Sequence, residues 1–263
     1  MTELGTVQIE HPEPGVAILR LHRPGQLNAL VAAMFTDIKA ACEQLQADES
    51  VNAFVLTGAG RGFCAGYDLD EAGELGQLSP AAMLARQDLA AASVLALRLA
   101  RQPVIAAVNG PAIGGGLALA LAADVRIASP AARFSAAFVR LGLSAGDMSC
   151  SWLLPRIVGA GHAAELMFTG TTIDSGEATR IGLVNRIVAE PELLPGALAM
   201  ARTIAGYSPF GMALSKRALQ ANLEAPSLYT ALEVESRGQA FATRDPGFAD
   251  ALEKVRAQFM RQP

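Results

Sequence analysis

Two glycine-bearing stretches contain the backbone groups best suited to chemistry. Residues 62–69 read GFCAGYDL, and residues 114–116 are three consecutive glycines followed by an Ala- and Leu-rich segment that runs to Asp124. Each stretch follows a short β-type run, and bare glycine backbone lets peptide N–H groups face a ligand. If the stretches converge, two N–H groups can stabilise negative charge on a carbonyl oxygen, where losing one donor typically costs about 3 kcal/mol. The alternative is that both glycine clusters only permit close packing.

Other catalytic signatures are missing or incomplete. The sequence contains neither the dinucleotide fingerprint GxGxxG nor the phosphate loop GxxxxGK[ST]. Residues 142–146, GLSAG, match the GxSxG pattern of serine hydrolases, but that fold needs a histidine much later in the chain than His162, the last of three. Few histidines and no clustered cysteines argue against a zinc site. We therefore expect no metal, and neither a dinucleotide cofactor nor a nucleoside triphosphate.

Composition favours a cytoplasmic enzyme with a sizeable core. The 263 residues are 51% hydrophobic with a formal net charge of −4, which argues against general binding to nucleic acid or to an anionic membrane. The N-terminal residues lack a signal-peptide pattern, and no apolar run is long enough to span a bilayer. Cys42, Cys64 and Cys150 are widely spaced, and we interpret them as reduced packing residues.

The pattern of elements predicts an α/β core domain over residues 1–200 and a helical region over residues 201–263. Asn28 is expected to cap a helix that ends near residue 47, and 62–76 is expected to be a loop. Asp70, Glu71 and Glu74 of this loop are interpreted as solvated charges, with a place at the mouth of a pocket as the alternative. Ser79 is a predicted helix cap, and either Asp174 or Ser175 is predicted to cap the helix near 175. Strands are predicted at 7–10, 16–21, 51–56, 104–108, 125–128, 134–138 and 184–188, and helices near 80–101, 149–158, 162–168, 175–181, 191–205, 209–221, 227–241 and 247–260.

Five ordered segments make the chain resemble the enoyl-CoA hydratase/isomerase (crotonase) superfamily along nearly its whole length. They are RPGQLNAL (23–30), GRGFCAGYDL (60–69), PVIAAVNGPAIGGGLALALAADVRIAS (103–129), LPRIVG (154–159) and ELMFTGTTIDSGEATRIGLVNRIV (165–188). The resemblance implies a crotonase-like spiral core of β-β-α turns, a helical C-terminal trimerisation region and assembly into homotrimers or homohexamers. It also implies an acyl-CoA thioester substrate, with coenzyme A as part of the substrate and no further cofactor.

The resemblance also implies roles for individual residues. The backbone N–H groups of Tyr67 and Gly115 would form the oxyanion hole. Arg23, Lys216 and Lys254 are candidates for the CoA phosphates, or else solvated cations. Asp68 could instead make structural hydrogen bonds, and Tyr67, Phe138, Met148 and Trp152 could shape an acyl site or simply pack in the core. Residues expected to border the substrate or its CoA are Gln26, Leu27, Asn28, Ala29, Cys64, Ala65, Gly66, Asp68, Leu69, Gly114 and Phe138.

The sequence departs from the superfamily pattern at the two glutamates of typical hydratases, whose positions hold Ala118 and Phe138. Asp147 matches a third position at which some superfamily members carry a catalytic carboxylate, although one extra residue after Phe138 leaves its direction open. Asp147 could equally cap the helix predicted near 149. We therefore expect isomerase-like or otherwise atypical chemistry through Asp147. The alternatives are a non-catalytic acyl-CoA-binding paralogue and an acyl-CoA thioester hydrolase.

Overall fold

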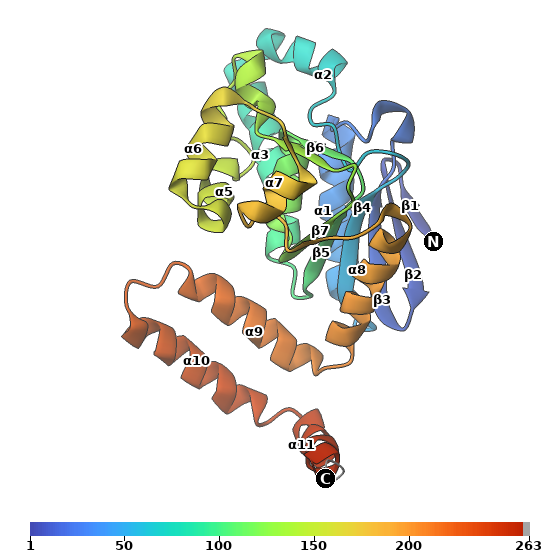
Figure 1. The fold of residues 1–263 in the computed structure, drawn as a ribbon, viewed down its shortest axis with the longest axis vertical. Coiled ribbons are helices and arrows are strands. Elements are labelled where there is room, and N and C mark those ends of the chain that lie inside the picture. The colour runs from blue at the N-terminus through green and yellow to red at the C-terminus, as the bar shows by residue number, and fades with distance from the viewer. Residues whose placement is uncertain (260–263) are drawn as a thin grey trace.

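A seven-stranded sheet forms the centre of the computed structural model, which describes residues 1–259 (Figure 1). Its strand order is β1-β2-β3-β4-β5-β7-β10, in which β1 to β3 are antiparallel and the pairs from β3 onward are parallel. The strands are β1 (Thr2–Leu4), β2 (Val7–Glu13), β3 (Gly15–Leu21), β4 (Val51–Gly58), β5 (Val104–Val108), β7 (Val125–Ala128) and β10 (Arg186–Ile187). A smaller sheet holds β6 (Pro111–Ile113), β8 (Arg133–Ser135) and β9 (Ile173–Asp174).

Helices cover both faces of the large sheet, which explains why its central strands are continuously apolar. Alternate side chains of β3 point to opposite faces: Val16 and Ile18 pack with α8 (Glu190–Ala205), whereas Ala17 and Leu19 belong to the larger core. That core also contains the apolar faces of α1 (Ala32–Ala47) and α3 (Pro80–Arg98) and most of α4 (Gly115–Ala122). The remaining helices of this part are α2 (Leu69–Glu74), α5 (Cys150–Val158), α6 (Ala160–Thr169) and α7 (Ser175–Arg180).

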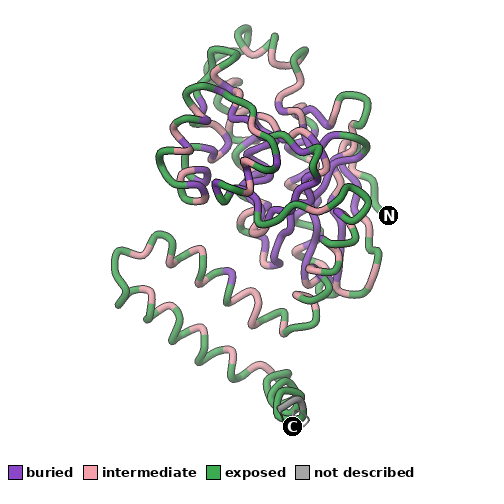
Figure 2. Tube along the Cα trace, in the orientation of Figure 1, coloured by how far each residue is buried: buried purple, intermediate pink, exposed green. Residues whose placement is uncertain are grey.

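Three C-terminal helices extend from the α/β body: α9 (Pro209–Asn222), α10 (Leu228–Ala242) and α11 (Gly247–Phe259) (Figure 1). Most of their residues are exposed or half-buried, in contrast to the strands above them (Figure 2). Helix α8 continues across residue 200 and packs on the sheet, so the architecture changes at α9. The mixed α/β fold with a helical C-terminal end agrees with the prediction, and the division into two domains stays a proposal.

The structure corrects several predicted boundaries of helices and strands, which depend on contacts between residues that are distant in the sequence. Asn28 does not cap α1, whose N-cap is Val31. The expected loop 62–76 contains α2. The strand expected at 134–138 is instead Arg133–Ser135, because a 3-10 turn follows at Ala137–Leu141. Strand β6 was not predicted, since its three residues are defined by their pairing with β8. The predicted caps Ser79 and Asp174 are confirmed by hydrogen bonds from Ala82 and Glu177.

Cys42, Cys64 and Cys150 are free and buried, as predicted. Within residues 1–259, none of the helices has both the length and the apolar character required to traverse a membrane.

Candidate active site

The loop around Tyr67 presents an unused backbone N–H. Leu30 pairs with this loop on one side: its N–H donates to Gly66 O at 2.7 Å, and its carbonyl accepts from Asp68 N at 2.9 Å. Because both neighbours of Tyr67 are turned toward Leu30, the N–H of Tyr67 faces the opposite side. Within residues 1–259 it donates to no acceptor. Gly66 has φ +94°, a conformation that glycine adopts without strain.

A second unused N–H belongs to Gly115, the first residue of α4. Gly114 has φ 52° and ψ −116°, a backbone conformation that only glycine tolerates, and its own N–H donates to Ser135 O at 2.8 Å. The N–H of Gly115 is one of the donors left free at a helix start, and it has no acceptor in the described part of the chain. All eight residues of α4 are buried, so the positive end of the helix acts in a medium of low dielectric constant.

The two loops are hydrogen-bonded to each other. Cys64 N donates to Pro111 O at 2.8 Å, and Ile113 N donates to Cys64 O at 3.0 Å. The contact is so close that a Cβ on Gly116 would lie 2.1 Å from the Cys64 carbonyl oxygen. The structure therefore brings together the two glycine stretches that the sequence separates by about fifty residues, and packing and presentation of N–H groups depend on the same glycines.

A cavity of about 750 Å³ opens where the loops meet. Eight of the residues predicted for the site line it: Ala65, Gly66, Tyr67, Leu69, Gly114, Gly115, Phe138 and Asp147. The rest of the wall is mainly apolar and comes from Leu75, Gly76, Met83, Gln87, Ile113, Ala137, Arg140, Leu141, Leu143, Ser144 and Gly146. Asp147 is the only carboxylate among these described lining residues. The cavity is within the size range of small-molecule sites.

Asp147 occupies a constrained turn at the cavity wall. Its Oδ1 accepts from Met148 N at 2.8 Å, and its carbonyl accepts from Cys150 N at 2.8 Å. Met148 and Ser149 follow with φ 46° and 64°, and Ser149 is the N-cap of α5. The expectation that Asp147 caps this helix is therefore corrected. Burial raises the pKa of Asp147, and the hydrogen bond from Met148 opposes that shift in part. A raised pKa suits a carboxylate that accepts a proton nearer neutrality.

The two residues that the family resemblance aligns with the hydratase glutamates are apolar and buried. Ala118 lies within α4 at 0% exposure, and Phe138 is 6% exposed. The Phe138 ring approaches Gly114 closely, since a Cβ on that glycine would lie 3.8 Å from the ring. Neither position can donate or accept a proton.

Six residues expected near the substrate do not line the cavity: Gln26, Leu27, Asn28, Ala29, Cys64 and Asp68. Asn28 is fully buried with φ 57°, and its amide joins two loops by donating to Ala59 O and Gly62 O and accepting from Arg23 N, all within 2.9 Å. Burial raises the pKa of the Cys64 thiol to about 12. The backbone N–H and carbonyl of Cys64 are both engaged, with Pro111 O and Ile113 N.

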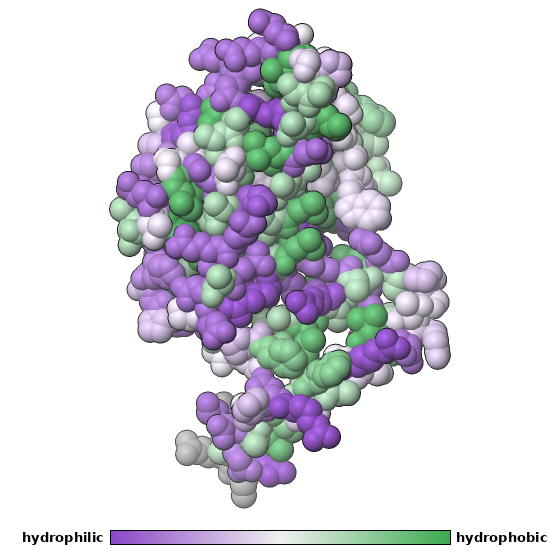
Figure 3. Space-filling model, turned by 180° about the vertical axis from the view of Figure 1, so that it is seen from behind, coloured by the Kyte–Doolittle hydropathy of each residue, from purple (hydrophilic) through white to green (hydrophobic). Residues whose placement is uncertain are grey.

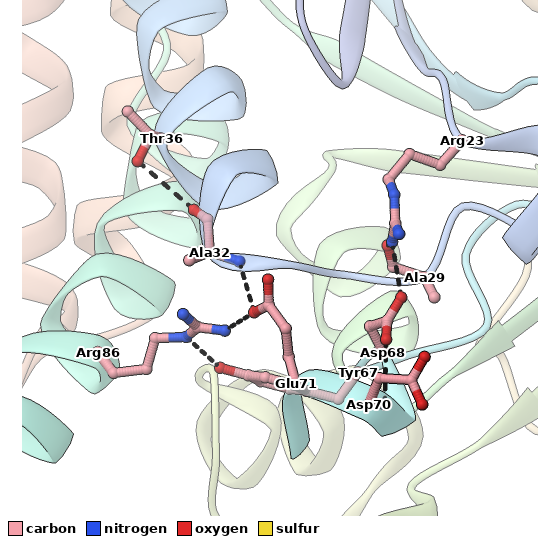
Figure 4. Close-up of polar contacts among 9 residues, drawn as sticks. All are labelled: Arg23, Ala29, Ala32, Thr36, Tyr67, Asp68, Asp70, Glu71 and Arg86. Atoms are coloured by element: carbon pink, nitrogen blue, oxygen red, sulfur yellow. Dashed lines mark hydrogen bonds and ion pairs between the residues drawn. The ribbon is translucent and has the colours of Figure 1, made fainter. Parts of the chain in front are cut away.

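The candidate phosphate ligands are placed differently from one another. Lys216 is buried, pairs with Asp124 at 2.8 Å and donates to Gln102 O, so the expectation of a solvated or phosphate-binding cation is corrected. Arg23 pairs with Asp68 at 3.0 Å (Figure 4). Lys254 is exposed on α11. Asp68 also caps α2 by accepting a hydrogen bond from Asp70 N, which supports the interpretation that Asp68 makes structural hydrogen bonds.

Met148 and Trp152 line a second cavity of about 460 Å³, between α3, α5 and α9. Of the four residues considered for an acyl site, only Tyr67 and Phe138 therefore line the cavity with the free N–H groups.

Sequence reasoning missed the contribution of α3 and of Glu71. Met83 and Gln87 of α3 line the cavity, and Arg86 of the same helix donates to the Tyr67 hydroxyl at 2.9 Å and pairs with Glu71 (Figure 4). The prediction that Glu71 is a solvated loop charge was wrong. No local pattern marks these residues, because they meet only when α2 and α3 fold onto α1.

The fold is a mixed α/β core in which two residues with unused N–H groups line one cavity. The chain belongs to the enoyl-CoA hydratase/isomerase family, whose model matches residues 11–262. It is 45% identical over 239 residues to a probable enoyl-CoA hydratase of Mycobacterium tuberculosis, covering 89% of this chain and 84% of that protein.

Two further comparisons extend this relationship. A 1,2-epoxyphenylacetyl-CoA isomerase of Escherichia coli is 35% identical to this chain over 246 residues, which cover 93% of each protein. The solved structure of a probable enoyl-CoA hydratase/isomerase from Mycobacterium abscessus superposes with a TM-score of 0.85 at 40% identity, covering 95% of this chain and 96% of that one. The chain is accordingly an acyl-CoA enzyme with the crotonase fold.

Proposed function

We propose that this enzyme isomerises an unsaturated acyl-CoA, with Asp147 as its only acid–base residue. The thioester oxygen would lie between the N–H groups of Tyr67 and Gly115. The observation that carries the proposal is the cavity wall, where Asp147 is the only carboxylate among the described lining residues and both hydratase glutamate positions are apolar.

A single carboxylate is sufficient for a double-bond shift. Asp147 removes a proton from C2 of a 3-enoyl-CoA, and the electron pair moves into the thioester to give a dienolate. The same carboxyl returns that proton to C4, the double bond moves to C2–C3, and no atom is gained or lost. Hydration, in contrast, needs one group to activate water and one to supply a proton. The two N–H donors stabilise the dienolate oxygen, and each typically contributes about 3 kcal/mol.

The apolar wall supports an acyl chain as the substrate portion in the cavity. Leu69, Leu75, Met83, Leu141 and Leu143 provide hydrocarbon contacts on several sides. Such surroundings also disfavour the ionised carboxylate, which is the physical cause of the raised pKa of Asp147. We also propose that the backbone of residues 26–29 and 64–65 borders the CoA portion of the substrate.

The names of the relatives include both a hydratase and an isomerase, so family membership leaves the reaction open. The test compares crotonyl-CoA hydration, 3-enoyl-CoA isomerisation and release of free CoA thiol, each with the wild type and Asp147→Asn. We expect isomerisation to dominate and to fall at least 100-fold in the variant, as loss of a general base typically causes. Asp70→Asn, an exposed acid on α2 outside the cavity, is the matched control and should retain activity.

Three outcomes would replace the proposal. Crotonyl-CoA hydration that survives Asp147→Asn would indicate a hydratase that uses other groups. Release of thiol as the main reaction would indicate a thioester hydrolase. Tight acyl-CoA binding without turnover of any substrate would indicate the non-catalytic paralogue.

We also propose that the chain assembles into homotrimers or homohexamers through α9 to α11. Large apolar side chains are exposed on these helices and gather over the lower part of the molecule (Figure 3): Leu219, Leu223, Leu228, Tyr229, Leu232, Phe241, Phe248, Leu252 and Val255. An apolar surface of this kind is typical of a protein–protein contact. Light scattering after size-exclusion chromatography should give three or six times the chain mass, and a monomer at micromolar concentration would contradict this assembly.

The free thiols support our proposal of a cytoplasmic location.

A further inference from the structure

Arg86 and Glu71 form a polar cluster around Tyr67 (Figure 4). Arg86 Nε donates to the Tyr67 hydroxyl at 2.9 Å, and Arg86 Nη2 pairs with Glu71 Oε2. The same Glu71 oxygen accepts from Ala32 N at 2.9 Å, in the first turn of α1. One guanidinium and one carboxylate thus connect α1, α2 and α3 to the loop that carries a proposed oxyanion donor.

The Tyr67 side chain is held on more than one side. Its ring packs against Phe35 of α1 with centroids 5.7 Å apart, and the Arg86 guanidinium carbon lies 5.6 Å from the Tyr67 ring centroid. The backbone on either side of Tyr67 is already held by Leu30. Rotation of the Gly66–Tyr67 peptide, which would turn the Tyr67 N–H, breaks the bond from Leu30 N to Gly66 O. The phenol held by Arg86 and Phe35 further restricts the movement of Tyr67 that would accompany such a rotation.

The geometry uses properties that arginine has and lysine lacks. Nε and Nη2 are two donors of one rigid plane, so Arg86 serves the phenol and the carboxylate together. A lysine ammonium is a point charge on a flexible stem and fixes neither direction. Glu71 also places negative charge at the N-terminus of the 16-residue helix α1, where such charge is favourable.

We propose that Arg86 and Glu71 are positioning residues that fix the Tyr67 N–H for the thioester oxygen. This inference rests on the proposed function, since it presumes that the Tyr67 N–H binds that oxygen. It assigns the pair a role beyond holding α1, α2 and α3 together, because Arg86 also bonds the side chain of the residue that carries the N–H.

The test measures polarisation of the bound thioester carbonyl together with turnover. Infrared difference spectra of a bound acyl-CoA report the C=O stretch, which moves to lower frequency when N–H donors polarise the bond. We expect Arg86→Gln and Glu71→Gln to reduce that frequency displacement and to lower kcat roughly tenfold, with KM nearly unchanged. The expected loss is smaller than the ~100-fold effect of a full 1 Å misplacement of a reacting group, because only the support of the donor is removed. Tyr67→Phe removes only the hydroxyl and should act in the same direction. Arg86→Lys should recover little.

The control is Arg20→Gln, which breaks an ion pair of similar exposure: Arg20 and Glu10 are 21% and 29% exposed, compared with 16% and 32% for Arg86 and Glu71. It should leave both the C=O stretch and kcat unchanged. A wild-type C=O stretch and wild-type kcat in folded Arg86→Gln would overturn the inference while leaving the proposed function intact. An undisplaced C=O stretch in the wild type would instead overturn the oxyanion hole itself. Losses of kcat that only follow the folded fraction would reduce the pair to a structural role.

Discussion

Gly116→Ala should separate the two loops that carry the proposed oxyanion donors. The new Cβ would lie 2.1 Å from the Cys64 carbonyl oxygen and 2.9 Å from the Cys64 carbonyl carbon, whereas ordinary contacts begin at 3.4 Å. These neighbours include backbone that is bonded to Pro111 and Ile113, so no side-chain rotation relieves the clash. The loops must move apart by about 1 Å or more, and a displacement of that size at a reacting centre typically costs about 100-fold in rate.

The same substitution should lower stability by about 1–3 kcal/mol, the usual cost of overpacking a core. Turnover of 3-enoyl-CoA and thermal unfolding, measured on the same preparation, separate the two effects. Gly161→Ala is the control, because Gly161 is exposed near the start of α6 with no atom near its Cβ position. It should keep full activity and gain up to about 1 kcal/mol of stability. Wild-type kcat/KM in Gly116→Ala would refute the claim that the two loops act as one site.

Three further predictions concern titration, thiol reactivity and loop anchoring. Because burial raises the pKa of Asp147 and the base must be ionised, kcat/KM should fall as pH drops through a value above that of an ordinary aspartate. A raised pKa in the folded state favours the protonated form, so Asp147→Asn should be more stable than wild type at pH 8, and the difference should vanish at pH values below the pKa of an unfolded aspartate. A wild type more stable than the variant at pH 8 would contradict the assignment. Burial raises the pKa values of Cys42, Cys64 and Cys150 to about 12, so mass spectrometry should show no alkylation by iodoacetamide at pH 8 until the protein unfolds. Asn28→Ala removes three hydrogen bonds from a buried amide and should cost roughly 3 kcal/mol in denaturant titration, since about 1 kcal/mol per bond is typical; a change below about 0.5 kcal/mol would be inconsistent with the anchoring role.

The fold was predictable wherever a local pattern agrees with its tertiary role. The apolar runs of β3 and β5 match buried strands, and Ser79 before Pro80 marks the start of α3. Strand β6 and helix α2 were not, because three paired residues and six helical ones carry too little signal of their own.

The site was predictable to the extent that it consists of backbone. Glycine loops at 66 and 114–116 are visible in the sequence, and the structure places both at one cavity. The side-chain contacts around them were hidden. Asn28 is a residue type that often caps helices, but here its side chain anchors two loops. Lys216 is a residue type that is usually exposed, but here it pairs with Asp124 in the interior. In each case the partner is distant in the sequence, so no local pattern could identify it.

Proton transfer in D₂O tests the central claim most directly. A 3-enoyl-CoA is incubated with enzyme in D₂O, and ¹H NMR follows the C2 and C4 positions of the acyl chain. The proposed mechanism predicts formation of the 2-enoyl-CoA. Its C4 should carry either the hydrogen that Asp147 removed from C2 or a deuterium that Asp147 took from the solvent before the transfer. It also predicts at least 100-fold slower transfer in folded Asp147→Asn, as for loss of a general base. Transfer at the wild-type rate in that variant, or accumulation of a 3-hydroxyacyl-CoA as the main product, would contradict it.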